Sequence, residues 1–288
     1  MTPPTWTSSS SDLLAEISQQ FTARSAGSSA GTVTGRPAVR PPLVLHSARR
    51  PALVLVAHGS RDPAALAEIR RLLALLRGAR PELDVRLAHL GLNAPLLPDV
   101  LAELAGPVVL VPLLLGRGYH VKVDLPALLA AAPQVSGTIT APLGPDGLLT
   151  EVLYERLVEA GWADPATVRE RHRHGRDAVV LAASGSRDPD AAADTEAQAR
   201  LLARRLHVPV VPGYVAAGSP SVAEAVAGLS ARGYRRIAVA GYFTAPGDFA
   251  RLAAAAGDWL TSAPLGAHEL MARLVLARYE HSRLRMAA

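Results

Sequence analysis

Two histidines of this chain, His58 and His120, stand where metal chemistry could take place. His58 follows the continuous apolar run PALVLVA, and His120 follows a glycine-rich stretch that comes after a second apolar run, PVVLVPLLL. A neutral imidazole is the commonest protein ligand for divalent transition metals, and it titrates near neutral pH. Two imidazoles on facing loops would hold one ion loosely and leave coordination positions open. The pair is therefore the first candidate for a site that receives and releases a metal.

Groups suited to a negatively charged ligand lie close to both histidines in the sequence. Ser60 and the backbone amides of residues 59–62 open a predicted helix, whose N-terminus favours anions. Arginine pairs with carboxylates in bidentate fashion, and a lysine supplies a point charge. The candidate substrate-binding residues on these grounds are Ser60, Arg61, Arg117, Tyr119 and Lys122.

Apolar runs of strand length alternate with segments of helical periodicity from Pro51 onward. After His58, Asp62 and Pro63 are suited to the N-cap and the first position of a helix over 64–77. The elements expected next are strand 84–90, helix 95–104, strand 107–115, helix 123–131, strand 137–143 and helix 147–160. This alternation predicts a parallel α/β sheet. Ligands bind at the carboxyl edge of such sheets, where both histidines are expected.

The second half of the chain repeats the first. Gly-Ser-Arg-Asp-Pro occurs at 59–63 and again at 185–189, and RRIAVAGYFTAPGDF parallels GPVVLVPLLLGRGYH. The period far exceeds that of a solenoid, so the pattern indicates two homologous domains. His58 corresponds to Ser184 and His120 to Phe249, so the second copy keeps the turn and lacks both imidazoles. This joint loss favours a functional role for the histidines.

Arg61 has a structural interpretation beside the functional one. Its counterpart Arg187 is kept in the copy that lost the histidines, so Arg61 could serve only to cap or bridge.

The duplication divides the chain into four parts. Residues 1–48 are rich in Ser, Pro and Gly and are expected to be a disordered tail. An N-terminal domain that carries the active site is expected over 51–161, a linker over 162–177, and a degenerate repeat domain over 178–281.

The composition excludes several classes of chemistry. The chain has 288 residues and no cysteine, which removes thiolate zinc sites, iron–sulfur clusters and cysteine nucleophiles. The net charge of +5 comes from scattered arginines, which argues against nucleic-acid binding. No apolar stretch approaches the ~20 residues of a membrane span, and the N-terminus lacks signal-peptide features. We expect a soluble, cytoplasmic protein with no membrane partner.

Two longer strings resemble a known family. LVAHGSRDP and VPLLLGRGYHVKVDLP are similar to the motifs of the sirohydrochlorin chelatases, the class II cobalto- and ferrochelatases of the CbiX and SirB type. In this family an apolar strand ends in His-Gly-Ser-Arg, and a later Pro-hydrophobic segment leads to Gly and then His-hydrophobic-Lys/hydrophobic-Asp-hydrophobic-Pro. The resemblance covers about residues 51–276, because long members of the family also carry two homologous domains.

The resemblance implies a fold and a reaction. The fold would be α/β, with two chelatase-like domains, each a parallel sheet flanked by helices, and a cleft between them for the macrocycle. The enzyme would insert Co²⁺ or Fe²⁺ into sirohydrochlorin, a tetrapyrrole with eight carboxylates, in siroheme or cobalamin biosynthesis. His58 and His120 would bind the metal and take up the pyrrole protons, which suits groups titrating near neutral pH. No organic cofactor is needed, and a monomer is expected because one chain supplies both domains.

One position departs from the family pattern. Many members carry a glutamate at the end of the second strand, where this chain has Gly91. His89 or Asn93 could replace that polar group, while the structural interpretation makes His89 a partly buried strand residue, since adjacent strand positions point to opposite faces.

Two other functions stay open at this point. The missing carboxylate and the eroded second domain are compatible with a non-catalytic carrier of metal or tetrapyrrole. The N-terminal tail is compatible with a regulatory paralogue that binds a partner protein.

Overall fold

A computed structural model describes residues 50–162, 177–257 and 259–287 of the chain. The predicted tail and nearly all of the predicted linker lie outside these residues. The helices and strands run in the order β1 Ala52–Ala57, α2 Pro63–Ala79, β2 Val85–His89, α3 Leu97–Ala102, β3 Gly106–Pro112, η1 His120–Asp124, α4 Leu125–Ala130, β4 Val135–Ile139, α5 Gly147–Glu159, β5 Asp177–Gly185, α7 Pro189–Leu206, β6 Val210–Ala217, α8 Val222–Ala231, β7 Arg236–Gly241, α9 Asp248–Ala255, β8 Leu260–Thr261 and α10 Glu269–Ala287.

The strands form two parallel sheets of the same topology, as expected from the alternating pattern. Each has four strands, in the orders β2-β1-β3-β4 and β6-β5-β7-β8. The first strand pairs with the third in the same register in both sheets, since Ala52 lies opposite Val108 and Ala178 opposite Ile237. This shared register makes Ser184 the structural equivalent of His58, and Phe249 that of His120.

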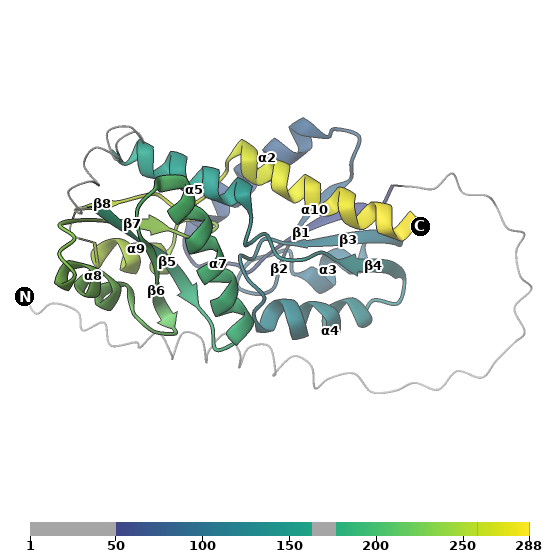
Figure 1. Ribbon diagram of the computed structural model, residues 1–288. Helices are drawn as coiled ribbons and strands as arrows, with labels where there is room; N and C mark the ends of the chain where they lie inside the picture. Colours follow the sequence, from purple (N-terminus) through teal and green to yellow (C-terminus); the bar gives the residue numbers. More distant parts are fainter. Residues whose placement is uncertain (1–49, 163–176, 258, 288) are drawn as a thin grey trace, which may run out of the picture. The chain divides into compact units, whose positions relative to one another are not determined.

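Helices cover both faces of each sheet. In Figure 1, α2 and α10 lie on one side of the first sheet, and α3 and α4 on the other. The strands β1 and β3 are apolar on both faces, as buried parallel strands usually are. Their residues contribute to two hydrophobic clusters, one shared with α3 and α4 and one that extends into the second half of the chain.

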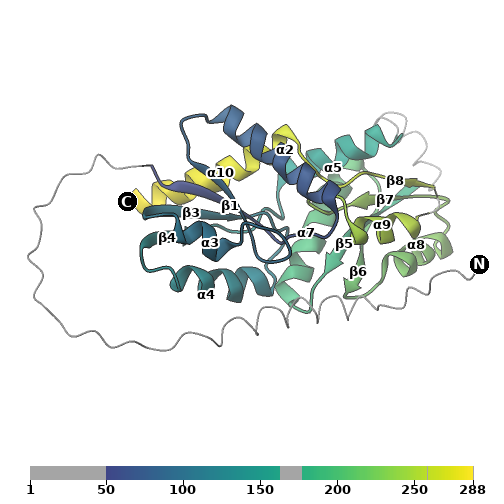
Figure 2. The same cartoon turned by 180° about the vertical axis from the view of Figure 1, so that it is seen from behind.

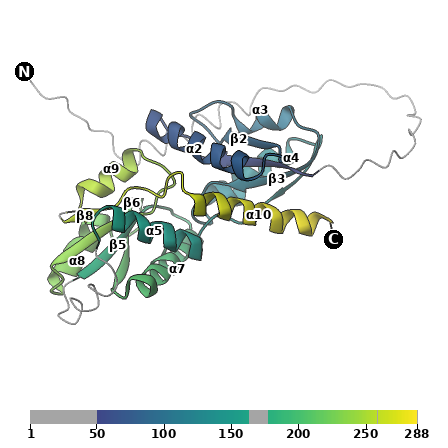
Figure 3. The same ribbon diagram turned by 90° about the horizontal axis from the view of Figure 1, so that it is seen from above.

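The last helices of the two repeats are exchanged between the sheets. α10, from the second repeat, packs on α2 and β3 of the first, and α5, from the first repeat, packs on α7 and β7 of the second. Figure 3 shows α10 beside α2, and Figure 2 shows α5 next to α7 from behind. Tyr279 on α10 is fully buried, and its hydroxyl donates to the carbonyl of Pro51 at 2.7 Å. The two repeats therefore share one hydrophobic core.

A reciprocal pair of ion pairs joins the repeats. Lys122 contacts Asp188 at 2.7 Å, and the structurally equivalent residues, Arg251 and Asp62, contact each other at 2.5 Å. Both aspartates are also N-caps, of α7 and α2, and accept a backbone N–H of their own helix. Each repeat thus supplies a basic residue that pairs with the N-cap aspartate of the other repeat.

The turn that the two repeats share requires glycine. Gly59 and Gly185 adopt φ values of +100° and +84°, where residues with a side chain are strained. A Cβ atom on Gly59 would lie 2.0 Å from the carbonyl oxygen of Gly91, and one on Gly185 would lie 1.7 Å from that of Ala217. The glycine of the Gly-Ser-Arg-Asp-Pro string is therefore required by backbone geometry in both copies.

The predicted helix over 123–131 begins earlier in the structure. A turn of π-helix, η1, starts at His120 and continues into α4, which ends at Ala130. Sequence periodicity does not reveal this start, because a single wide turn is too short to show a repeat of apolar residues. His120 therefore occupies a helical turn rather than a loop.

Candidate functional site

The two candidate histidines contact each other, although 62 positions separate them in the chain. The Nε2 atoms of His58 and His120 are 3.1 Å apart, and their rings meet edge to face with centroids separated by 4.7 Å. His58 follows β1, and His120 starts η1 after β3, the strand next to β1. Both therefore lie at the carboxyl edge of the sheet, as the sequence predicted.

Each ring presents its other nitrogen to an oxygen acceptor. Nδ1 of His120 lies 2.5 Å from the carboxylate of Asp124, and Nδ1 of His58 lies 3.4 Å from the carbonyl of Gly59. An Nδ1–H that donates to oxygen leaves the lone pair of a neutral imidazole on Nε2. In these tautomers both Nε2 atoms, 3.1 Å apart, carry a lone pair that a metal can use. Nitrogens that share a metal at ~2.1 Å with an angle near 90–110° stand about 3.0–3.4 Å apart, which matches this pair.

Asp124 is a site residue that the sequence reasoning did not select. It lies four positions after His120 on η1, and its side chain is only 15% exposed. A carboxylate behind a metal-binding imidazole fixes the tautomer and the orientation of the ring. The available signal was the His-x-x-x-Asp spacing, which places two side chains on one face once the segment is helical.

The environment of His58 favours its neutral form. Burial is the main cause that lowers the pKa of His58 below its ordinary value of 6.5, and the neighbouring His120 ring adds to it. The Gly59 carbonyl and the Asp124 carboxylate act in the opposite direction. The net direction keeps a lone pair available for a metal at neutral pH.

This lowered pKa predicts a pH-dependent stability in the metal-free protein. In the unfolded chain His58 takes up a proton near its ordinary pKa of 6.5, whereas in the folded protein it stays neutral to lower pH. The unfolded state then binds more protons, so the free energy of unfolding falls as the pH drops below 6.5. Urea unfolding of the wild type and of His58→Gln across this range measures the effect. The variant should lose less stability, and equal losses would contradict the assignment.

Arg117 and Lys122 contact carboxylates of the second repeat. The guanidinium of Arg117 pairs with the buried Asp194 at 2.7 Å, and Lys122 pairs with both Asp188 and Asp190. A substrate carboxylate would have to compete with these ion pairs. Their partners lie at least 66 positions away in the chain, and the sequence analysis did not foresee them.

The other predicted substrate-binding residues remain near the histidine pair. Tyr119 is 62% exposed, and its ring lies edge to face with that of His120 at a centroid distance of 6.3 Å. Arg61 is exposed. Ser60 has a structural role: its hydroxyl accepts the backbone N–H of Asp62, and its own N–H donates to the side chain of Asn93 at 2.7 Å.

His89 is buried rather than exposed to a substrate. Its side chain is fully buried, and its Nδ1 contacts the carbonyl of Pro95 at 3.2 Å. Its place at the end of β2 directs it into the protein, so the prediction that it could bind substrate needs correction. Asn93 is engaged with Ser60, and a Cβ atom on Gly91 would meet nothing within 4 Å. A side chain at position 91 would therefore meet no steric obstacle, so crowding does not explain why this chain lacks the carboxylate.

The histidine pair would leave most coordination positions of a bound metal unfilled by the protein. Within the ranges that the structure describes, no group of three or more His, Asp or Glu side chains is arranged to hold a metal ion.

No helix in the same ranges is both long and apolar enough to cross a membrane.

Two named relatives are similar to this chain over different lengths. The sirohydrochlorin ferrochelatase of Priestia megaterium is 25% identical over 244 residues, which is 78% of this chain and 87% of that protein. The sirohydrochlorin cobaltochelatase of Methanococcoides burtonii is 25% identical over 123 residues, 37% of this chain and 94% of its own length.

A solved structure shares the fold. The sirohydrochlorin chelatase SirB of Bacillus subtilis subspecies spizizenii, crystallised with cobalt, superposes with a TM-score of 0.61 at 22% identity. The match covers 81% of this chain and 95% of SirB. The model of the CbiX family matches residues 52–160 and 178–282, which is most of both repeats. The chain therefore belongs to the CbiX family.

Proposed function

We propose that this protein is a chelatase that inserts a divalent metal into sirohydrochlorin. The observation that carries the proposal is the 3.1 Å separation of the His58 and His120 Nε2 atoms, each backed by an oxygen acceptor at Nδ1. Relatives named sirohydrochlorin ferrochelatase and cobaltochelatase, and a cobalt-bound structural neighbour, support the same reaction. The metal is a substrate here, so an open two-ligand site suits its transfer.

The pair can serve both parts of the reaction. Insertion replaces two pyrrole N–H protons by one divalent cation, so each turnover releases two protons. His58 and His120 first hold the cation through Nε2. Once the metal has passed to the macrocycle nitrogens, the same lone pairs are free to accept the protons, so the two imidazoles act as general bases. Asp124 stabilises the imidazolium that forms on His120.

We propose that the macrocycle lies over the histidine pair against Tyr119. This exposed aromatic ring next to His120 offers a face for a flat conjugated ligand. Arg61, exposed on the adjacent turn, is the candidate partner for a substrate carboxylate.

Absorbance spectroscopy tests the function directly. Purified protein mixed with sirohydrochlorin and Co²⁺, Fe²⁺ or Ni²⁺ in turn should accelerate the spectral change that marks metal insertion above the rate without protein. The ratio of initial rates identifies the ion that the protein prefers. Rates equal to the uncatalysed reaction for all three ions would overturn the proposal.

The same titration examines a carrier role, which the open coordination and the empty position at Gly91 favour. A carrier would bind sirohydrochlorin or the metal tightly without accelerating their combination.

We further propose that the enzyme acts as a monomer, because both repeats already lie in one chain and share a core. We propose the cytoplasm as its location, as expected from the sequence.

A further inference from the structure

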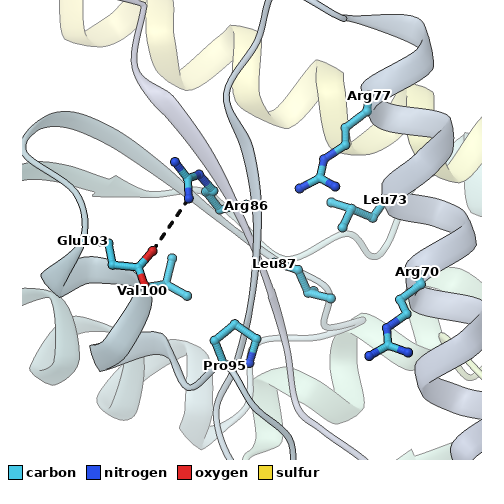
Figure 4. A pocket seen from close by; sticks show the side chains of 8 residues that line it. All are labelled: Arg70, Leu73, Arg77, Arg86, Leu87, Pro95, Val100 and Glu103. Carbon is cyan, nitrogen blue, oxygen red and sulfur yellow. Dashed lines mark ion pairs between the residues drawn. The ribbon is translucent and has the colours of Figure 1, made fainter.

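A pocket of about 300 Å³ lies at the outer edge of the first sheet, on strand β2. Helix α2 forms one wall and helix α3 the other (Figure 4). The lining consists of three arginines, one glutamate and four apolar residues: Arg70, Arg77, Arg86, Glu103, Leu73, Leu87, Pro95 and Val100. Neither histidine of the metal-transfer site is among them.

The charges in this pocket are not balanced. Arg86 pairs with Asp84 at 2.6 Å and with Glu103 at 3.7 Å. Arg77 donates through Nε and Nη2 to the carbonyl of Val85, a neutral group. Arg70 has neither a hydrogen bond nor an ion pair within the described part of the chain. Two guanidinium groups on one face of α2 therefore lack a carboxylate partner, and Figure 4 shows both directed toward β2.

The edge of β2 adds a backbone donor. The bonds from Leu53 N–H to the Asp84 carbonyl and from Leu90 N–H to the Ala57 carbonyl set the pairing with β1. In this register, alternate residues of β2 bond to β1, and Leu87 directs its N–H and C=O to the open edge. No described residue bonds to either group of Leu87. A free N–H thus stands beside two unneutralised arginines.

We infer that this pocket binds a small oxyanion, a carboxylate- or phosphate-bearing molecule, at a site separate from metal insertion. Arg70 and the remaining nitrogen of Arg77 would pair with the oxygens, and the Leu87 N–H would donate a third hydrogen bond. Leu73 and Val100 would contact the apolar part of the ligand. A volume near 300 Å³ is at the lower end for small-molecule sites, which suits a ligand of few atoms.

An added peptide strand fits this edge less well. Strand addition needs a row of free backbone groups. Arg77 already occupies the Val85 carbonyl, and the His89 N–H donates to the Pro95 carbonyl. Of the outward-facing residues of β2, only Leu87 has both its N–H and its C=O without a described partner, which suits one hydrogen-bonded anion better than an added strand.

Calorimetric titration of the metal-free protein with inorganic phosphate, and separately with citrate, tests the site. We expect one of the two to bind with a dissociation constant of about 1 mM or tighter, and the tighter one identifies the ligand as a phosphate or a carboxylate. Arg70→Gln should weaken this binding about tenfold, since a charge-assisted hydrogen bond is lost. Arg70 has no described partner, so the variant should fold normally.

The matched control is Arg71→Gln on the same helix. Arg71 is the next residue, pairs with Glu68 and does not line the pocket, so this variant removes the same charge outside the site. Binding in Arg71→Gln should stay within about twofold of the wild type. The site is refuted if neither anion binds, if Arg70→Gln binds as the wild type does, or if both variants weaken binding equally.

Discussion

Replacing His120 with alanine lowers the rate of metal insertion by about 10²–10⁴-fold or more, and His58→Ala does the same. Each variant leaves one imidazole at a site where the structure provides two Nε2 lone pairs at 3.1 Å and no third ligand among the described residues. A single imidazole neither orients the ion nor shares the proton uptake. The measurement is the initial rate of the spectral change with Co²⁺ and sirohydrochlorin.

The double variant and a surface histidine provide the controls. His58→Ala/His120→Ala should be little worse than either single variant, because groups that act as a unit are not additive. His281→Ala removes an exposed imidazole from α10 and should keep the wild-type rate. Circular dichroism verifies that the fold persists. Wild-type rates in both single variants would exclude the pair from the reaction.

The second large effect is expected for Asp124→Asn, with a loss of about 10–100-fold in metal affinity or activity. Asp124 accepts the Nδ1–H of His120 at 2.5 Å and thereby keeps the His120 lone pair on Nε2. An asparagine can instead present its NH₂ to Nδ1, which would favour the opposite tautomer and remove the lone pair from the metal side.

Nuclear magnetic resonance separates this positioning role from a general loss of structure. The ¹⁵N shifts of the His120 ring report the tautomer directly and should move in Asp124→Asn. Asp99→Asn, which changes an exposed carboxylate at the start of α3, should alter neither the tautomer nor the rate. An unchanged tautomer with an unchanged rate would show that Asp124 is not needed.

The two histidines could be predicted because their positions follow from short-range rules. Each comes after an apolar run, and the carboxyl ends of adjacent parallel strands meet at one edge. Asp124 escaped the prediction because its relation to His120 depends on a helical turn that begins at His120 itself. The sequence pattern favoured a helix from Val123, which would leave His120 outside it. A shift of three residues in a helix start was enough to hide the contact.

The ion pairs of Lys122 and Arg117 could not be predicted from the sequence for a different reason. Basic residues near a proposed anion site are compatible with substrate binding, and nothing local distinguishes that role from pairing with distant aspartates. The exchange of α5 and α10 is equally invisible in the pattern. Periodicity shows which side of a helix is apolar, but it does not show which repeat supplies the surface that covers it.

The exchange of α5 and α10 gives the repeat that lacks the imidazoles a structural role in the other repeat. The buried Tyr279 and its neighbours on α10 complete the core beneath β1 and β3, the strands that lead to His58 and His120. Deleting the second repeat would therefore remove part of the scaffold of the working one. The second repeat therefore carries Ser184 and Phe249 where the first has His58 and His120, while its last helix remains part of the scaffold of the first.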